Sequence, residues 1–135
     1  HIASLRDALS VFMAKGKADY LVDKKIIEFL PIEHLRGRSL HRCTIIADEM
    51  QNATSHSVLT ILTRLGDHSS IAMLGDVIQR DLSNRFGKDG LSDAARRLAK
   101  DSDNTGHVNF GFDDIVRSDF VKSVILAYSD LYEGR

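Results

Sequence analysis

With 135 residues, 43% hydrophobic and 27% charged, the chain has the size and composition of one ordinary globular domain. Its net charge of −1 excludes a field that would draw nucleic acid or anionic membranes to the whole surface. The single cysteine, Cys43, excludes an internal disulfide and fits a reducing compartment. No apolar run approaches the roughly 18 residues of a membrane span, and no signal-peptide pattern occurs. We therefore expect a cytoplasmic protein without a membrane partner.

The first part of the chain predicts two helices, a short strand and a basic turn. Apolar residues recur at intervals of three and four over residues 2–16, which predicts an amphipathic helix, and a second helix is expected over 17–25. Residues 26–31 (IIEFLP) predict a brief strand that Pro31 ends. Residues 34–42 (HLRGRSLHR) predict a basic turn that either contacts phosphate or nucleic acid or is simply solvated.

From residue 43 onward, predicted strands and helices alternate. Strands are expected over residues 43–49, 70–76 and 107–112, helices over 55–65, 91–101 and 118–132, and a polar loop over 78–90. Thr54 or Ser55 is expected to cap the helix over 55–65, and Gly66 to close it. In the last helix we expect an inward face made of Phe120, Val121, Val124, Ile125 and Tyr128. Such alternation predicts parallel βαβ units, and therefore an α/β sandwich.

Two of the predicted strands end in acidic residues. The first ends in Asp48 and Glu49, and the second ends in Asp76. Because ligands of parallel α/β sheets gather beyond the carboxyl ends of the strands, these acids should share the ligand-binding edge. An Asp–Glu pair after a strand is the Walker B arrangement of nucleotide hydrolases, in which the aspartate holds a hydrated Mg²⁺ and the glutamate activates water. The alternative is that both acids cap the next helix or lie in solvent.

A glutamine follows the second acid at a spacing that suits the same chemistry. Gln79 stands three residues after Asp76, where its amide is able to bind both a terminal phosphate oxygen and the attacking water. Taken alone, Gln79 fits a surface turn better. Its pairing with the acid motif on a neighbouring predicted strand favours the nucleotide site. The six histidines show no metal-binding spacing.

Six ordered motifs resemble those of the PhoH family, the phosphate starvation-inducible P-loop ATPases. They are LRGRSL, IIADEMQNAT, LTRLG, GDVIQRDL, GKDGL and DIVRSDFVKSVILAY, and they extend over about residues 26–130. The initial segment SLRDAL is similar to the PLYDAL segment of that family. The resemblance implies a three-layer α/β sandwich with a mainly parallel sheet, a partial P-loop NTPase fold like that of RecA and superfamily-one helicases. It also implies that ATP and Mg²⁺ are the ligands.

The resemblance assigns roles to eight residues. Asp48 would hold Mg²⁺ through water and Glu49 would be the catalytic base, while Gln79 and Gln51 would sense the γ-phosphate beside Asp76. Three arginines fall in matched motifs and would contact the nucleotide: Arg38, Arg64 and Arg117. Arg64 and Arg117 are candidates for arginine fingers across a subunit boundary, in which case the protein is a homo-oligomer. The alternative for each arginine is a salt bridge to an acid at the sheet edge.

The phosphate-binding loop of this family, GxxxxGK[ST], does not occur in the sequence. The resemblance implies that it lies upstream of His1, so we expect residues 1–135 to be a single PhoH-like ATPase domain without its N-terminal P-loop part. The isolated chain should then bind ATP poorly. Two other hypotheses remain open: a non-catalytic module for oligomerisation or partner binding, and an RNA helicase-like motor with RNA as its partner.

Overall fold

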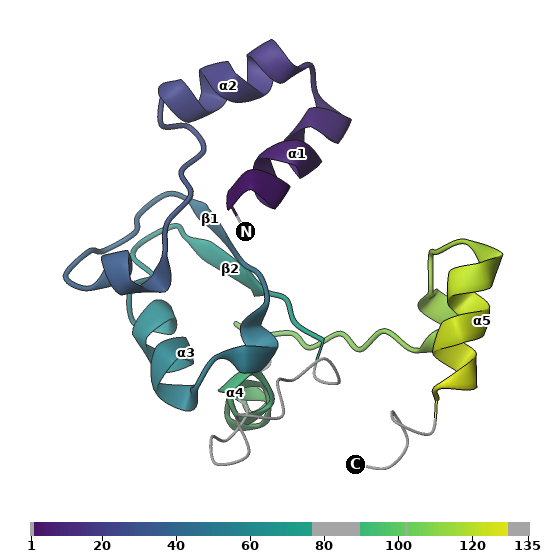
Figure 1. Cartoon of the computed structure of the whole chain (residues 1–135). Coiled ribbons are helices and arrows are strands. Elements are labelled where there is room, and N and C mark those ends of the chain that lie inside the picture. The colour runs from purple at the N-terminus through teal and green to yellow at the C-terminus, as the bar shows by residue number, and fades with distance from the viewer. Residues whose placement is uncertain (1, 77–89, 102, 130–135) are drawn as a thin grey trace. The chain divides into compact units, whose positions relative to one another are not determined.

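The computed structural model describes residues 2–76, 90–101 and 103–129. The chain forms two compact units, residues 1–37 and 38–135. Figure 1 shows the elements, whose bounds in chain order are α1 Ile2–Phe12, α2 Lys15–Asp23, η1 Ile32–Leu35, β1 Thr44–Ala47, η2 Met50–Asn52, α3 Ser55–Leu62, β2 Ser70–Met73, α4 Gly90–Leu98, η4 Phe112–Asp114 and α5 Asp119–Ala127; each η is a short 3-10 helix. No helix in these ranges is long and apolar enough to cross a membrane.

The first unit confirms both predicted helices but not the strand predicted over 26–31. Lys25 has a positive φ of 55°, which turns the chain after α2. The backbone N–H groups of Ile26 and Ile27 then donate to the Leu21 carbonyl at 2.9 and 3.1 Å, instead of to a neighbouring strand. Pro31 precedes η1. The strand prediction was wrong because an apolar run alone does not supply a pairing partner.

The second unit contains a parallel strand pair, which confirms the α/β class. β1 and β2 pair in register from Thr44↔Ser70 to Ala47↔Met73. An isolated parallel bridge, Leu40↔Leu65, extends the pairing toward the amino ends of the strands. Parallel neighbours need a crossover connection, and α3 lies within the connection between β1 and β2. Both strands are shorter than the predicted ranges of 43–49 and 70–76, and Asp48, Glu49 and Asp76 lie after the observed strands; at Glu49 the positive φ of 59° has already ended the extended conformation.

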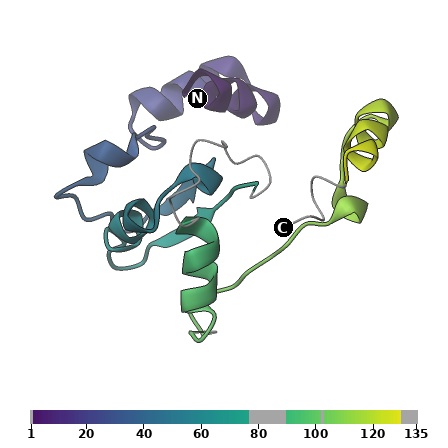
Figure 2. The same cartoon turned by 60° about the horizontal axis from the view of Figure 1, so that its bottom comes forward.

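The core of this unit lies at α3, α4 and η2. The helices α3 and α4 lie side by side, as Figure 1 and Figure 2 show from two directions. Met50, Val58 and Ile61 are at most 2% exposed and Ala94 is 7% exposed. Thr54 caps α3 by accepting a hydrogen bond from the Ser57 backbone N–H at 3.1 Å, which confirms that predicted cap. Leu62 ends the helix, so Gly66 does not close it; the Gly66 N–H donates to the Leu40 carbonyl instead.

The last part of the chain differs from the prediction at two places. Residues 104–111 form no strand, and Val108 and Phe110 are 74% and 82% exposed. The face of α5 predicted to be inward is not buried: only Ile125 is half-buried, whereas Phe120 is 77% exposed. Helical periodicity identifies an apolar face without showing what covers it. Of the loop predicted over 78–90, residues 78–89 lie outside the described residues, and Gly90 already begins α4.

Candidate functional site

Asp48 and Glu49 lie where β1 ends, and both side chains are exposed. The Asp48 carboxylate accepts a hydrogen bond from the Glu49 backbone N–H, with 3.0 Å between Oδ1 and N. Glu49 itself has φ 59° and ψ 34°, the left-handed conformation that a residue with a side chain seldom adopts. The chain therefore turns sharply at the acid pair, and this turn leads directly into η2.

The second acid motif, Gly75 and Asp76, lies beside the first because the strand pairing continues beyond β1 and β2. The Leu74 N–H donates to the Ala47 carbonyl at 2.8 Å, and the Met50 N–H donates to the Leu74 carbonyl at 2.9 Å. These two bonds place Gly75 and Asp76 beside the turn at Glu49. Asp76 is half-buried. The structure thus brings together the acids that the sequence assigned to one edge of the sheet.

Gln51 connects the two motifs directly. Its side chain is 3% exposed, and its Nε2 donates to Glu49 Oε2 at 2.7 Å. Its Oε1 accepts a hydrogen bond from the Asp76 backbone N–H at 3.3 Å. The sequence suggested that Gln51 contacts phosphate, but did not suggest this bridge. The sequence signal for this bridge was Gly75, directly before Asp76. Because glycine has no Cβ, the backbone at position 75 is able to lie against Gln51.

Two of the predicted arginines lie in loops. Arg38 and Arg117 are exposed residues in loops, Arg38 ahead of β1 and Arg117 just before α5. Gln79 lies outside the described residues.

Arg64 follows α3 at the opposite end of the strand pair from Asp48. Its carbonyl accepts a hydrogen bond from the Leu40 N–H at 2.8 Å, four residues before β1 begins. The Arg64 Nη2 lies 3.4 Å from Thr63 Oγ1, while its buried Nε has no hydrogen-bond partner among the described residues. The turn that holds Arg64 is further fixed by His41, whose Nδ1 accepts from the Asp67 N–H at 3.1 Å.

The acid edge fits a magnesium ion that is shared with a phosphate ligand. Across residues 2–76, 90–101 and 103–129, no three His, Cys, Asp or Glu side chains converge enough to hold an ion alone. Mg²⁺ does not require such a cage, because it keeps several waters and binds through one or two carboxylates plus substrate phosphates. Asp48 and Glu49 offer exposed carboxylate oxygens, and Asp76 is adjacent. The donor set therefore suits a hydrated ion.

A separate polar cluster joins α3 to α4. The Asp93 carboxylate, on a residue 9% exposed, accepts hydrogen bonds from Ser55 Oγ at 3.0 Å, Arg96 Nη2 at 2.6 Å and Arg97 Nε at 2.8 Å. The hydrogen bonds from Arg97 and then Arg96 lower the pKa of Asp93 from 3.8 to about 2. Only the apolar face of this helix was predicted from the sequence. The sequence signal for the cluster is an aspartate followed three and four residues later by arginines.

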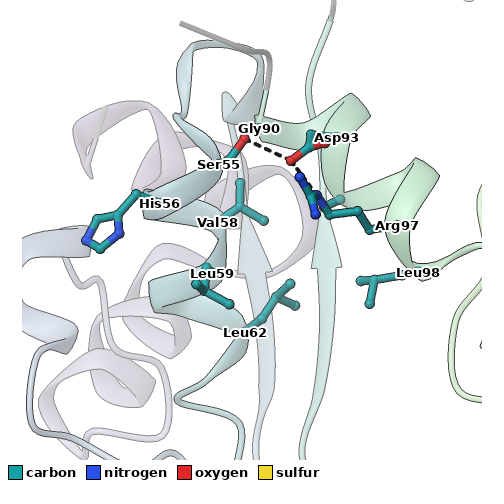
Figure 3. A pocket seen from close by; sticks show the side chains of 10 residues that line it. Ser55, His56, Val58, Leu59, Leu62, Gly90, Asp93, Arg97 and Leu98 are labelled. Atoms are coloured by element: carbon teal, nitrogen blue, oxygen red, sulfur yellow. Dashed lines mark hydrogen bonds and ion pairs between the residues drawn. The ribbon is translucent and has the colours of Figure 1, made fainter.

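The Asp93 cluster closes one end of a groove between α3 and α4. Figure 3 shows Ser55 and Arg97 directed at Asp93, with Val58, Leu59, Leu62 and Leu98 along the groove. The volume of the groove is about 330 Å³. Two of the three donors to Asp93, Arg96 and Arg97, lie on α4 itself, and the bond from Ser55 joins α4 to α3. The acid pair after β1 does not line the groove.

These features define an α/β protein whose parallel strands deliver acids to one edge of the sheet. The sequence model of the family described as PhoH-like protein matches residues 1–129, so the chain belongs to the PhoH-like family. It is 36% identical over 124 residues to a PhoH-like protein of Synechocystis sp., 34% identical over 128 residues to one of Bacillus subtilis, and 39% identical over 103 residues to Protein PhoH of Escherichia coli. These matches cover 92%, 95% and 76% of the chain, but only 37%, 40% and 28% of the three relatives.

Proposed function

We propose that the chain contributes the strand-end acids of an ATP-hydrolysing site in a PhoH-like protein. The observation that carries this proposal is the junction after β1 and β2, where the buried Gln51 side chain bonds both to Glu49 Oε2 and to the backbone N–H of Asp76. Membership of the PhoH-like family supports it. The parallel pair with a crossover helix also fits the three-layer, P-loop NTPase type of sandwich, of which this chain would form a part.

Each residue of the junction has a role in this proposal. Asp48 would hold the hydrated Mg²⁺, and Glu49 would accept a proton from the attacking water. Gln79 would sense the γ-phosphate beside Asp76, which is the role that the family resemblance implies for it. Bound Mg²⁺ supplies the positive charge that neutralises the phosphate oxygens during phosphoryl transfer. The loop that cradles the phosphates in this class, GxxxxGK[ST], is absent from the printed sequence, so the isolated chain should bind ATP weakly.

Arg64 favours a homo-oligomer in this proposal. The hydrogen bonds of its backbone place it at the amino end of the strand pair, away from Asp48. An arginine for the phosphates would then come from a neighbouring copy of the chain, as the resemblance implied. Light scattering behind size-exclusion chromatography, with and without Mg²⁺ and ATP, tests this directly. A monomer under both conditions would contradict it. RNA remains the partner proposed for coupling to hydrolysis.

The test of the function is Glu49→Gln in the full-length product of the gene. We expect ATP hydrolysis to fall by roughly 10²–10⁴-fold, the usual contribution of a general base, while ATP binding stays within about twofold. Glu33→Gln is the matched control, because Glu33 is an exposed glutamate in the other unit and should leave both unchanged. Unchanged hydrolysis in Glu49→Gln, or no hydrolysis by the wild-type protein, would overturn the proposal.

A further inference from the structure

Gln51 is a buried amide next to exposed acids, and this contrast requires an explanation. A carboxamide withdrawn from water costs free energy unless its polar atoms find partners. Gln51 is 3% exposed, yet its two bonds go to Glu49 Oε2 and to the Asp76 N–H rather than to the core. Its burial therefore serves to connect the two acid motifs.

The bond to Glu49 fixes one oxygen of the carboxylate that the proposed reaction uses. At 2.7 Å, the contact between Nε2 and Oε2 is short, as expected when an amide donates to an ionised acceptor. The backbone of Glu49 is also constrained, since it has φ 59° and its N–H donates to Asp48 Oδ1. Strained backbone conformations concentrate at functional sites, where the surrounding structure holds them. Gln51 is one of the groups that hold the strained backbone conformation of Glu49 in place.

The bond to Asp76 depends on the residue before it. A Cβ placed on Gly75 would lie 2.8 Å from the Gln51 backbone nitrogen and 3.0 Å from Gln51 Oε1. Any larger residue at position 75 would push Gln51 and the Asp76 N–H apart. Gly75 therefore permits the amide to bridge the two strand ends.

We propose that Gln51 is a positioning residue that fixes the Glu49 carboxylate to the Asp76 backbone, so that the two acid-bearing turns are held as one unit. This inference rests on the proposed function for its catalytic consequence, but not for the link itself. It differs from a phosphate-sensing role, because the Nε2 and Oε1 of Gln51 are both engaged within the protein. The amide acts on the reaction through Glu49 and need not touch the nucleotide.

The link itself is tested on this chain without nucleotide. Gln51→Met keeps the length and burial of the side chain but removes both hydrogen bonds. We expect the Asp76 amide to exchange its hydrogen about three to ten times faster in this variant, measured by NMR, because one hydrogen bond is lost. Asn109→Ala is the control, since it removes an exposed amide and should change nothing at Asp76. Unchanged exchange at Asp76 in Gln51→Met would refute the link.

The catalytic consequence is tested on the full-length product. If Gln51 positions the base, Gln51→Met should lower kcat by about tenfold or more. This loss is a part of the roughly 10²–10⁴-fold that a general base contributes. The KM for ATP should change by less than about twofold. Adding Gln51→Met to Glu49→Gln should cause no further loss. A full kcat in Gln51→Met, or a rise in KM alone, would overturn the positioning role. Absence of wild-type hydrolysis would instead overturn the proposed function and leave the exchange result to decide on the link.

Discussion

Gly90→Ala tests how tightly α4 is joined to the turn after Gln51. Gly90 is the first residue of α4 and is buried, and its N–H donates to the Ala53 carbonyl at 3.0 Å. A Cβ at this position would lie 2.5 Å from both the carbonyl carbon and the oxygen of Thr54, and 2.7 Å from the Ala53 oxygen. All three are backbone atoms, so no side chain is able to rotate out of the way.

The magnitude follows from the displacement that the methyl group demands. Ordinary contact begins at 3.4 Å, so α4 must move by about 0.9 Å, the difference between 3.4 and 2.5 Å. Overpacking of this kind costs about 1–3 kcal/mol, and weakening the bond to Ala53 adds about 1 kcal/mol. Replacing glycine by alanine in a helix recovers at most about 1 kcal/mol. We therefore expect Gly90→Ala to lower the free energy of unfolding by about 1–3 kcal/mol.

Urea unfolding followed by far-UV circular dichroism measures this change. The matched control is Gly106→Ala in the same unit, where nothing lies within 4 Å of the added Cβ and φ is outside the left-handed range. The free energy of unfolding of Gly106→Ala should be unchanged or up to about 1 kcal/mol higher, because alanine restricts the conformations of the unfolded chain. The reasoning would be refuted if Gly90→Ala proved as stable as Gly106→Ala, since the backbone contact between α4 and Thr54 would then not exist.

Two further predictions concern the polar contacts of α3. The pKa of Asp93 is lowered in the folded protein from 3.8 to about 2, so its stabilising effect is complete above about pH 4 and is lost as the pH falls through about 2. The difference in unfolding free energy between wild type and Asp93→Asn should shrink over this range in acid titrations at fixed urea, and a constant difference would contradict it. Thr54→Ala removes the cap that accepts from the Ser57 N–H and should cost about 0.5–2 kcal/mol by thermal or urea unfolding. If Thr54→Ser is no more stable than Thr54→Ala, the hydroxyl does not cap the helix.

The sequence predicted those elements whose signals are local. Periodicity and a capping threonine, which are local signals, indicated α3. A β-branched run before an acid indicated β1, for which β2 supplies the pairing partner. The strand expected over 26–31 failed for the opposite reason. A strand exists only if another segment pairs with it, and the N–H groups of Ile26 and Ile27 bond back to Leu21.

The candidate site was predictable in part, because the motifs that carry its acids are local in the sequence. The order of the motifs placed Asp48 and Asp76 after strands, and parallel pairing then brought them to one edge. The burial of Gln51 was not predictable, since it depends on the close approach of Gly75 from 24 positions further along the chain. The bond that Asp93 accepts from Ser55 likewise joins residues 38 apart, although the arginines that also bind Asp93 are within one helical turn of it.

The parallel register of β1 and β2 has a consequence for how the site comes into being. Parallel strands pair only after the chain has crossed over through α3, so the first hydrogen bond of the ladder must close a long loop. Gln51 reaches Asp76 across a sequence separation of 25, and this bond has no local precursor. We therefore expect the two acid-bearing turns to be joined through Gln51 only once β1 and β2 have paired, so that this link forms late relative to local structure such as α3.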